Sequence, residues 1–95
     1  MISEQDRNAI IQTARNYGAH RILLFGSSSF PSGEGKDIDI AVEGIPPKKF
    51  FQFYGELMFK VSKPLDIVDL SQNSRFTQLV RQDGMVLYER FENPY

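Results

Sequence analysis

Two aspartates spaced two residues apart are the side chains in this sequence best placed to do chemistry. Residues 37–43 read DIDIAVE, so acidic and aliphatic residues alternate before an apolar end. This period of two predicts a β-strand that carries Asp37 and Asp39 on one face, roughly 6.5–7 Å apart, and the aliphatic residues on the other, toward helices. Neighbouring carboxylates repel unless a cation, a proton or solvent lies between them. Mg²⁺ suits this position because it binds carboxylate oxygens and completes its shell with water and phosphates. A solvated strand edge is the alternative for a DxD motif taken alone.

A glycine and a serine precede this strand at the end of another one. Residues 21–25, RILLF, form a continuous apolar run that predicts a strand buried on both faces. Gly26 allows a ligand to approach the backbone closely, and Ser27 offers a hydroxyl and an amide to a phosphate. Residues 26–36 include three Gly, four Ser and one Pro, which predicts a loop whose amides can bind an anion. Lys36 is followed by Asp37 and not by Ser or Thr, which excludes a Walker-type phosphate loop.

A third carboxylate is available on a later predicted strand, Pro64 to Leu70, which reads PLDIVDL. Asp66 and Asp69 are three residues apart, so on a regular strand they point to opposite faces. Only one of them can join Asp37 and Asp39. The alternation of residues alone does not choose between them.

The remaining elements predict how these strands are held. Ser3 can cap a first helix that runs to Tyr17 and ends at Gly18, with Asp6 as a capping-box partner. The other predicted elements are a helix from Pro46-Pro47 to about Val61, a helix from Asn73 to Asp83 and a short strand from Met85 to Tyr88. Together they indicate an α/β (α+β) fold, with a mixed sheet of three to four strands and helices mainly on one face.

Composition excludes several classes of function. The 95 residues suffice for one domain, 1–95, and 41% hydrophobic with 24% charged residues is typical of a globular chain. A net charge of −1 argues against a broad nucleic-acid surface. The absence of cysteine excludes disulfides and thiolate chemistry, and the one histidine, His20, is expected to be structural or solvated. No apolar run is long enough to span a bilayer and the first residues are acidic and polar, so we expect a cytoplasmic protein without membrane contact.

The motifs in this order resemble the minimal nucleotidyltransferases of the DNA polymerase β superfamily. The resemblance rests on Gly26-Ser27, the DxD pair and the later LDIVD segment, and it covers nearly the whole chain. It implies a site in which Asp37, Asp39 and one acid of PLDIVDL bind two Mg²⁺ ions, and the family pattern favours Asp66. It also implies that Gly26 and Ser27 hold the triphosphate of the substrate, ATP.

The sequence departs from the family pattern in two places. Family members often carry arginines just after Gly-Ser, where this chain has Ser28, Ser29 and Phe30. Lys36 stands where the family often has serine before the first acid. Lys36 either compensates in part for the missing arginines in nucleotide binding or is a solvated lysine.

The resemblance implies transfer of AMP from ATP to an acceptor hydroxyl, which a partner protein can supply. Such domains are often encoded beside a helical HEPN-type protein as antitoxin and toxin, so the alternative is a non-catalytic module that binds and neutralises that partner. Phe59 falls on the polar side of the second helix, near Phe51 and Met58, and Phe91 and Tyr95 follow in the tail. These residues predict an apolar contact surface for a partner or for a homodimer. In the alternative interpretation they only complete a small core.

Overall fold

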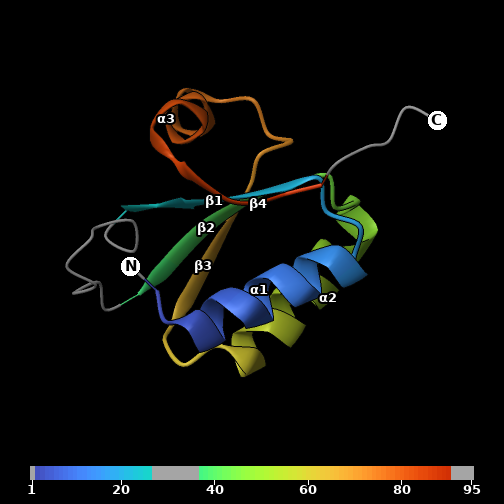
Figure 1. Ribbon diagram of the computed structural model, residues 1–95. Coiled ribbons are helices and arrows are strands. Elements are labelled where there is room, and N and C mark those ends of the chain that lie inside the picture. Colours follow the sequence, from blue (N-terminus) through green and yellow to red (C-terminus); the bar gives the residue numbers. More distant parts are fainter. Residues whose placement is uncertain (1, 27–36, 91–95) are drawn as a thin grey trace.

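A four-stranded mixed sheet forms the centre of the protein, as the computed structural model of residues 2–26 and 37–90 shows (Figure 1). The strands lie in the order β3-β2-β1-β4. In chain order, the elements are α1 (Glu4–Asn16), β1 (Arg21–Phe25), β2 (Ile38–Glu43), α2 (Pro47–Lys60), β3 (Leu65–Asp69), α3 (Arg75–Asp83) and β4 (Met85–Glu89). These bounds lie within two residues of the predicted ones.

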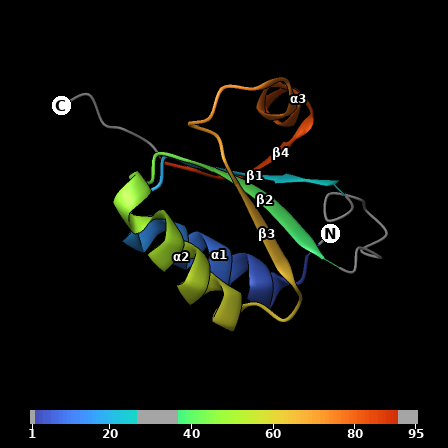
Figure 2. The same cartoon turned by 180° about the vertical axis from the view of Figure 1, so that it is seen from behind.

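The connections between the strands explain why the sheet is mixed. β1 pairs antiparallel with both β2 and β4, whereas β2 and β3 are parallel because α2 returns the chain between them. α1 and α2 lie side by side on one face of the sheet, and α3 lies on the other (Figures 1 and 2). The predicted α+β fold, with helices mainly on one face, is confirmed.

The main core lies between the sheet and the α1–α2 pair. The aliphatic residues that alternate with the acids of β2 point into it, as predicted, and Phe53 and Leu57 of α2 meet them there with no exposed surface. The cluster of buried residues is Ile10, Ala14, Ala19, Ile22, Leu24, Ile38, Ile40, Val42, Ile45, Phe53, Leu57 and Ile67. The period-two pattern of β2 therefore determines which face carries the acids.

The first helix begins as expected but makes only half of the expected capping box. The Ser3 hydroxyl accepts a hydrogen bond from the Asp6 amide at 3.1 Å. The Asp6 carboxylate is buried and instead accepts from the amide and the hydroxyl of Ser62, at 2.9 and 2.6 Å. Asp6 therefore ties the start of α1 to the segment after α2. A complete capping box occurs at α3, between Ser74 and Thr77.

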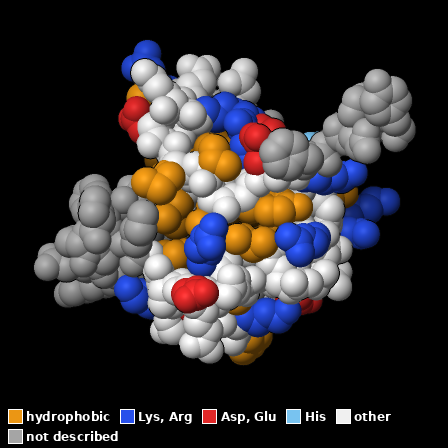
Figure 3. Space-filling view, in the orientation of Figure 1, with side chains coloured by type: hydrophobic (Ala, Val, Ile, Leu, Met, Phe, Trp, Pro, Cys, Tyr) orange, Lys and Arg blue, Asp and Glu red, His pale blue; other side chains and the backbone are white. Residues whose placement is uncertain are grey.

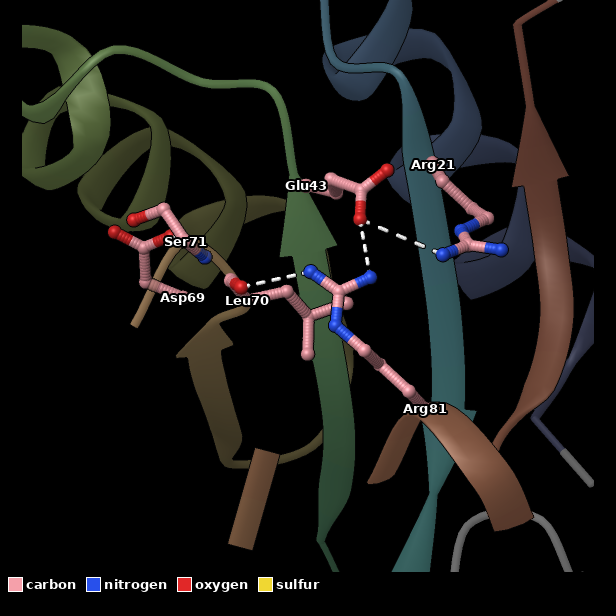
Figure 4. A network of polar contacts seen from close by, with 6 residues as sticks. All are labelled: Arg21, Glu43, Asp69, Leu70, Ser71 and Arg81. Carbon is pink, nitrogen blue, oxygen red and sulfur yellow. Dashed lines mark hydrogen bonds and ion pairs between the residues drawn. The ribbon is translucent and has the colours of Figure 1, made fainter. Parts of the chain in front are cut away.

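A smaller core and an ion-pair network attach α3 to the opposite face. Leu23, Ala41, Leu70 and Val80 form the small core. Beside them, Glu43 of β2 binds both Arg21 of β1 and Arg81 of α3, and Arg81 also donates to the Leu70 carbonyl at 2.8 Å (Figure 4). The hydrogen bond from Arg81, with the nearby Arg21 charge, lowers the pKa of Glu43. Because folding lowers the pKa of Glu43, the network stabilises the attachment of α3 at pH values above the ordinary pKa of glutamate, which include neutral pH.

The aromatic residues on the outer side of α2 are exposed, as predicted. Phe51 and Phe59 are 82% and 87% exposed, and Met58 is also exposed. The alternative that they complete the core is wrong. Phe91 and Tyr95 of the predicted contact surface lie outside the described residues.

Hydrophobic side chains also gather on the face of the molecule between α3 and α1 (Figure 3). Met85 and Val86 of β4 are exposed, and a pocket of about 330 Å³ lies between α1 and β4. His20 is exposed, in agreement with the expectation of a solvated residue. In the described ranges 2–26 and 37–90, no helix is long and apolar enough to cross a membrane.

Candidate functional site

The two parallel strands β2 and β3 bring two of the predicted acids together. Asp39 and Asp66 are direct register partners, so their side chains share one face of the sheet, the face that α3 partly covers. Asp37 precedes β2 by one residue and has the same parity as Asp39. All three lie on the face opposite the aliphatic side chains of the main core.

The other acid of β3 lies on the opposite face. Asp69 pairs in register with Val42, which points into the main core, and its carboxylate accepts a hydrogen bond from the Ser71 amide at 2.9 Å (Figure 4). Of the two alternatives that the sequence left open, the structure places Asp66 and not Asp69 beside Asp39.

Electrostatic repulsion among the three carboxylates is visible at Asp39. Its pKa is raised, first by burial and then by the negative charges of Asp66 and Asp37. A carboxylate in this position is more stable when a cation neutralises it. Asp37 and Asp66 therefore both disfavour the charged form of Asp39.

Gly26 lies directly against the Asp39 carboxylate. Phe25 is the register partner of Asp39 across the β1–β2 pair, and Gly26 follows with a φ of 64°. A Cβ atom at Gly26 would lie 2.6 Å from Asp39 Oδ2, closer than any side chain tolerates. The positive φ therefore favours glycine here, and a methyl group at this position would have to displace the Asp39 carboxylate. The two other predicted nucleotide-binding residues, Ser27 and Lys36, lie outside the described residues.

The donor chemistry of these acids fits Mg²⁺, although they do not form a closed cage. Among residues 2–26 and 37–90, no three acidic, histidine or cysteine side chains are grouped to hold a metal ion. Mg²⁺ commonly takes only one or two protein carboxylates and completes its shell with water and substrate phosphates. The neighbouring Asp39 and Asp66 can supply such a set, because both offer only hard oxygen ligands.

Sequence reasoning missed two features around these acids. Phe76 of α3 is half exposed and packs edge-on against Phe25, with ring centroids 6.0 Å apart. Tyr54 lies on the inward face of α2, yet it reaches β3 and places its hydroxyl 3.4 Å from Asp66 Oδ1. The only sequence signal for the second contact is the position of Tyr54 on the inward face of α2.

A mixed sheet that carries acids on adjacent strands beside a glycine, with two helices behind it, is the arrangement of a nucleotidyltransferase domain. Comparison with family models agrees. The model described as "Polymerase beta, Nucleotidyltransferase" matches residues 8–93, and the chain belongs to this family. The resemblance in the motifs to the minimal nucleotidyltransferases is thereby confirmed.

Solved structures extend this comparison. A toxin–antitoxin with AMP-PNP has 28% identity and a TM-score of 0.70, over 88% of this chain and 73% of the other. The toxin–antitoxin MntA-HepT has 26% identity and a TM-score of 0.68, over 93% and 74%. A tri-AMPylated Shewanella oneidensis HEPN toxin in complex with MNT antitoxin has 27% identity and a TM-score of 0.66, over 90% and 71%. No curated protein matches.

Proposed function

We propose that this protein is a cytoplasmic Mg²⁺-dependent nucleotidyltransferase that transfers AMP from ATP to a hydroxyl on a partner protein. The observation that carries the proposal is the placement of Asp39 and Asp66 on adjacent parallel strands, with Gly26 against Asp39. The similar toxin–antitoxin structure with AMP-PNP and the AMPylated toxin complex support the choice of nucleotide and transferred group.

In this proposal, Asp37, Asp39 and Asp66 hold two Mg²⁺ ions. Bound there, the ions would stabilise the charge on the attacking hydroxyl and on the leaving pyrophosphate. The acceptor oxygen forms a bond to the α-phosphorus of ATP, the bond from this phosphorus to the pyrophosphate breaks, and the hydroxyl proton passes to solvent. Gly26, Ser27 and Lys36 orient the triphosphate. The protein then contributes mainly positioning and charge, which agrees with the lack of cysteine.

The partner that we propose is a HEPN-type helical protein. Two of the similar structures are named as complexes of this kind, MntA-HepT and the HEPN toxin with MNT antitoxin. The exposed Phe51 and Phe59 on α2 give this chain an apolar surface that a protein partner can cover. A second copy of the chain would be the other occupant of this surface.

A second candidate function is a non-catalytic antitoxin that binds and neutralises the same partner. The observation that favours it is the absence of arginines after Gly26-Ser27, where Ser28, Ser29 and Phe30 stand. Without these cations the triphosphate would be held less tightly. The two candidates share the fold and the partner and differ only in nucleotide transfer.

A transfer experiment separates the two candidates. The chain is recovered from its own cells with any bound protein and incubated with α-labelled ATP and Mg²⁺. We expect the label to appear on the partner and to disappear when EDTA replaces Mg²⁺. A stable complex without label would support the non-catalytic antitoxin, and the absence of both complex and label would contradict both candidates.

Replacing Gly26 by alanine should distinguish an effect on stability from an effect on ATP binding. Gly18 provides the matched control, since it has a similar φ of 74° but no atom within 4 Å of an added Cβ. Both substitutions should cost about 1 kcal/mol of stability because of the positive φ, or roughly 4–8 °C in Tm. Only Gly26→Ala should also weaken ATP binding in Mg²⁺, because its methyl group displaces the Asp39 carboxylate. Equal ATP affinities for the two variants in calorimetry would show that Gly26 does not serve the site.

A further inference from the structure

We propose that Tyr54 is the positioning residue of Asp66: its hydroxyl fixes the edge strand that carries this carboxylate. The inference rests on the proposed function, in which Asp66 is a Mg²⁺ ligand. It adds a residue from α2, on the far face of the sheet, to the machinery that prepares the site.

The hydroxyl of Tyr54 makes two contacts with the backbone of β3. It donates to the Leu65 carbonyl at 2.9 Å, and the Ile67 backbone N–H lies near enough to the same oxygen to lower the pKa of Tyr54. These groups belong to the residues just before and just after Asp66. A single phenolic oxygen is therefore bonded to the residue before Asp66 and lies close to the residue after it.

The position of β3 in the sheet makes this support necessary. β3 is the outermost strand and pairs only with β2 among the described strands. The free side of an edge strand otherwise presents its amides and carbonyls to water and frays more readily than a central strand. Tyr54 lies on that free side, next to the residues that flank Asp66.

The distances also show that Tyr54 leaves the carboxylate available. The hydroxyl has one hydrogen, and the Leu65 carbonyl accepts it at an ordinary distance. Asp66 Oδ1 lies 3.4 Å from the same oxygen, longer than the roughly 2.5–3.0 Å typical of hydroxyl hydrogen bonds. Tyr54 thus holds Asp66 mainly through the backbone, and its contact with the carboxylate is long.

The side chain of Tyr54 is itself well anchored, as a positioning residue must be. Its ring packs against the main core and meets Phe50 edge-on, with centroids 6.2 Å apart. Groups that orient metal ligands in this way typically change metal affinity about 10–100-fold when they are removed.

Tyr54→Phe is the test, and Tyr17→Phe is its matched control. Each substitution removes one partly buried hydroxyl, but Tyr17 lies at the C-terminal end of α1. Its hydroxyl donates to Glu56 at 3.1 Å and so joins α1 to α2 instead of α2 to β3. ATP binding is followed by calorimetry over a range of Mg²⁺ concentrations. Thermal unfolding of the metal-free proteins measures the structural effect of each change.

We expect Tyr54→Phe to need roughly tenfold more Mg²⁺ for half-maximal ATP binding and to recover wild-type ATP affinity when Mg²⁺ saturates. Tyr17→Phe should keep the wild-type Mg²⁺ dependence, and both variants should unfold within a few degrees of each other. Identical Mg²⁺ dependence in the wild type and Tyr54→Phe would overturn the positioning role alone. A wild-type protein whose ATP binding ignores Mg²⁺ would instead overturn the proposed function, and the inference with it.

Discussion

The Asp39→Asn variant is expected to lose Mg²⁺-dependent ATP binding and at the same time to be more stable than the wild type without metal. Asparagine keeps the shape of the side chain but removes the charge that a cation requires. We expect at least about a 100-fold loss of AMP transfer, since outer groups of metal sites alone account for 10–100-fold. The gain in stability follows from removing a carboxylate that burial, Asp66 and Asp37 all disfavour.

The pH dependence of this gain has a definite sign. The folded pKa of Asp39 is raised above its ordinary value of 3.8, so the folded protein binds this proton more tightly than the unfolded chain. The unfavourable contribution of Asp39 is therefore absent well below pH 3.8, grows as the pH rises through the folded pKa and is complete at neutral pH. The stability difference between Asp39→Asn and the wild type should follow the same course in thermal unfolding at a series of pH values without metal.

Asp66→Asn and Asp69→Asn provide the internal comparison for this site. We expect the first to impair Mg²⁺-dependent ATP binding and the second to leave it intact, because only Asp66 shares the face of Asp39. The reverse result would identify Asp69 as the third ligand. For Asp39→Asn, a stability difference from the wild type that stays constant from pH 3 to pH 8 would contradict the repulsion assigned to Asp39.

Truncation of Phe53 to alanine should have the largest effect on stability, about 3–5 kcal/mol. The ring has no exposed surface, lies in the main core and meets Tyr17 edge-on at 5.5 Å. Its removal leaves a cavity between α1, α2 and the sheet that neighbouring side chains fill only in part. Since domains of this size are stable by roughly 5–15 kcal/mol in total, the variant should be close to unfolding at 37 °C. Chemical denaturation at 25 °C measures the difference.

Phe59 on the same helix is the matched control because it is 87% exposed. Phe59→Ser should change the stability of the isolated chain by no more than about 0.5 kcal/mol. At a real interface the lost burial of roughly 1.5–3 kcal/mol would weaken the complex about tenfold or more. Sedimentation of the chain alone and with its partner distinguishes the two effects. Unchanged association in Phe59→Ser would remove this side of α2 from the proposed contact surface.

The sequence predicts most of this fold because its signals are local. The alternation in residues 37–43 gives a strand with one acidic and one aliphatic face, and the exposed Phe59 follows from the helical period alone. The choice between Asp66 and Asp69 is different in kind. It depends on the register of β3 against β2, which alternation along one strand does not contain.

Contacts between distant segments account for what the sequence did not predict. Asp6 has the spacing of a capping-box residue, yet its carboxylate bonds to Ser62, 56 positions along the chain. Tyr54 has the spacing of a core residue, yet its hydroxyl reaches past the core to the edge of β3. In each case the tertiary arrangement provides a partner that no local pattern specifies.

The parallel pairing of β2 and β3 also constrains the order in which the protein can mature. Asp39 and Asp66 become neighbours only after the chain has closed the long connection that contains α2, and such non-local pairings are slow to form. A nascent chain that has made β1, β2 and α2 has folded much of its hydrophobic surface but has no carboxylate from the neighbouring strand beside Asp39. The pairing that places Asp66 beside Asp39 therefore depends on a long-range contact of the fold that no local element supplies by itself.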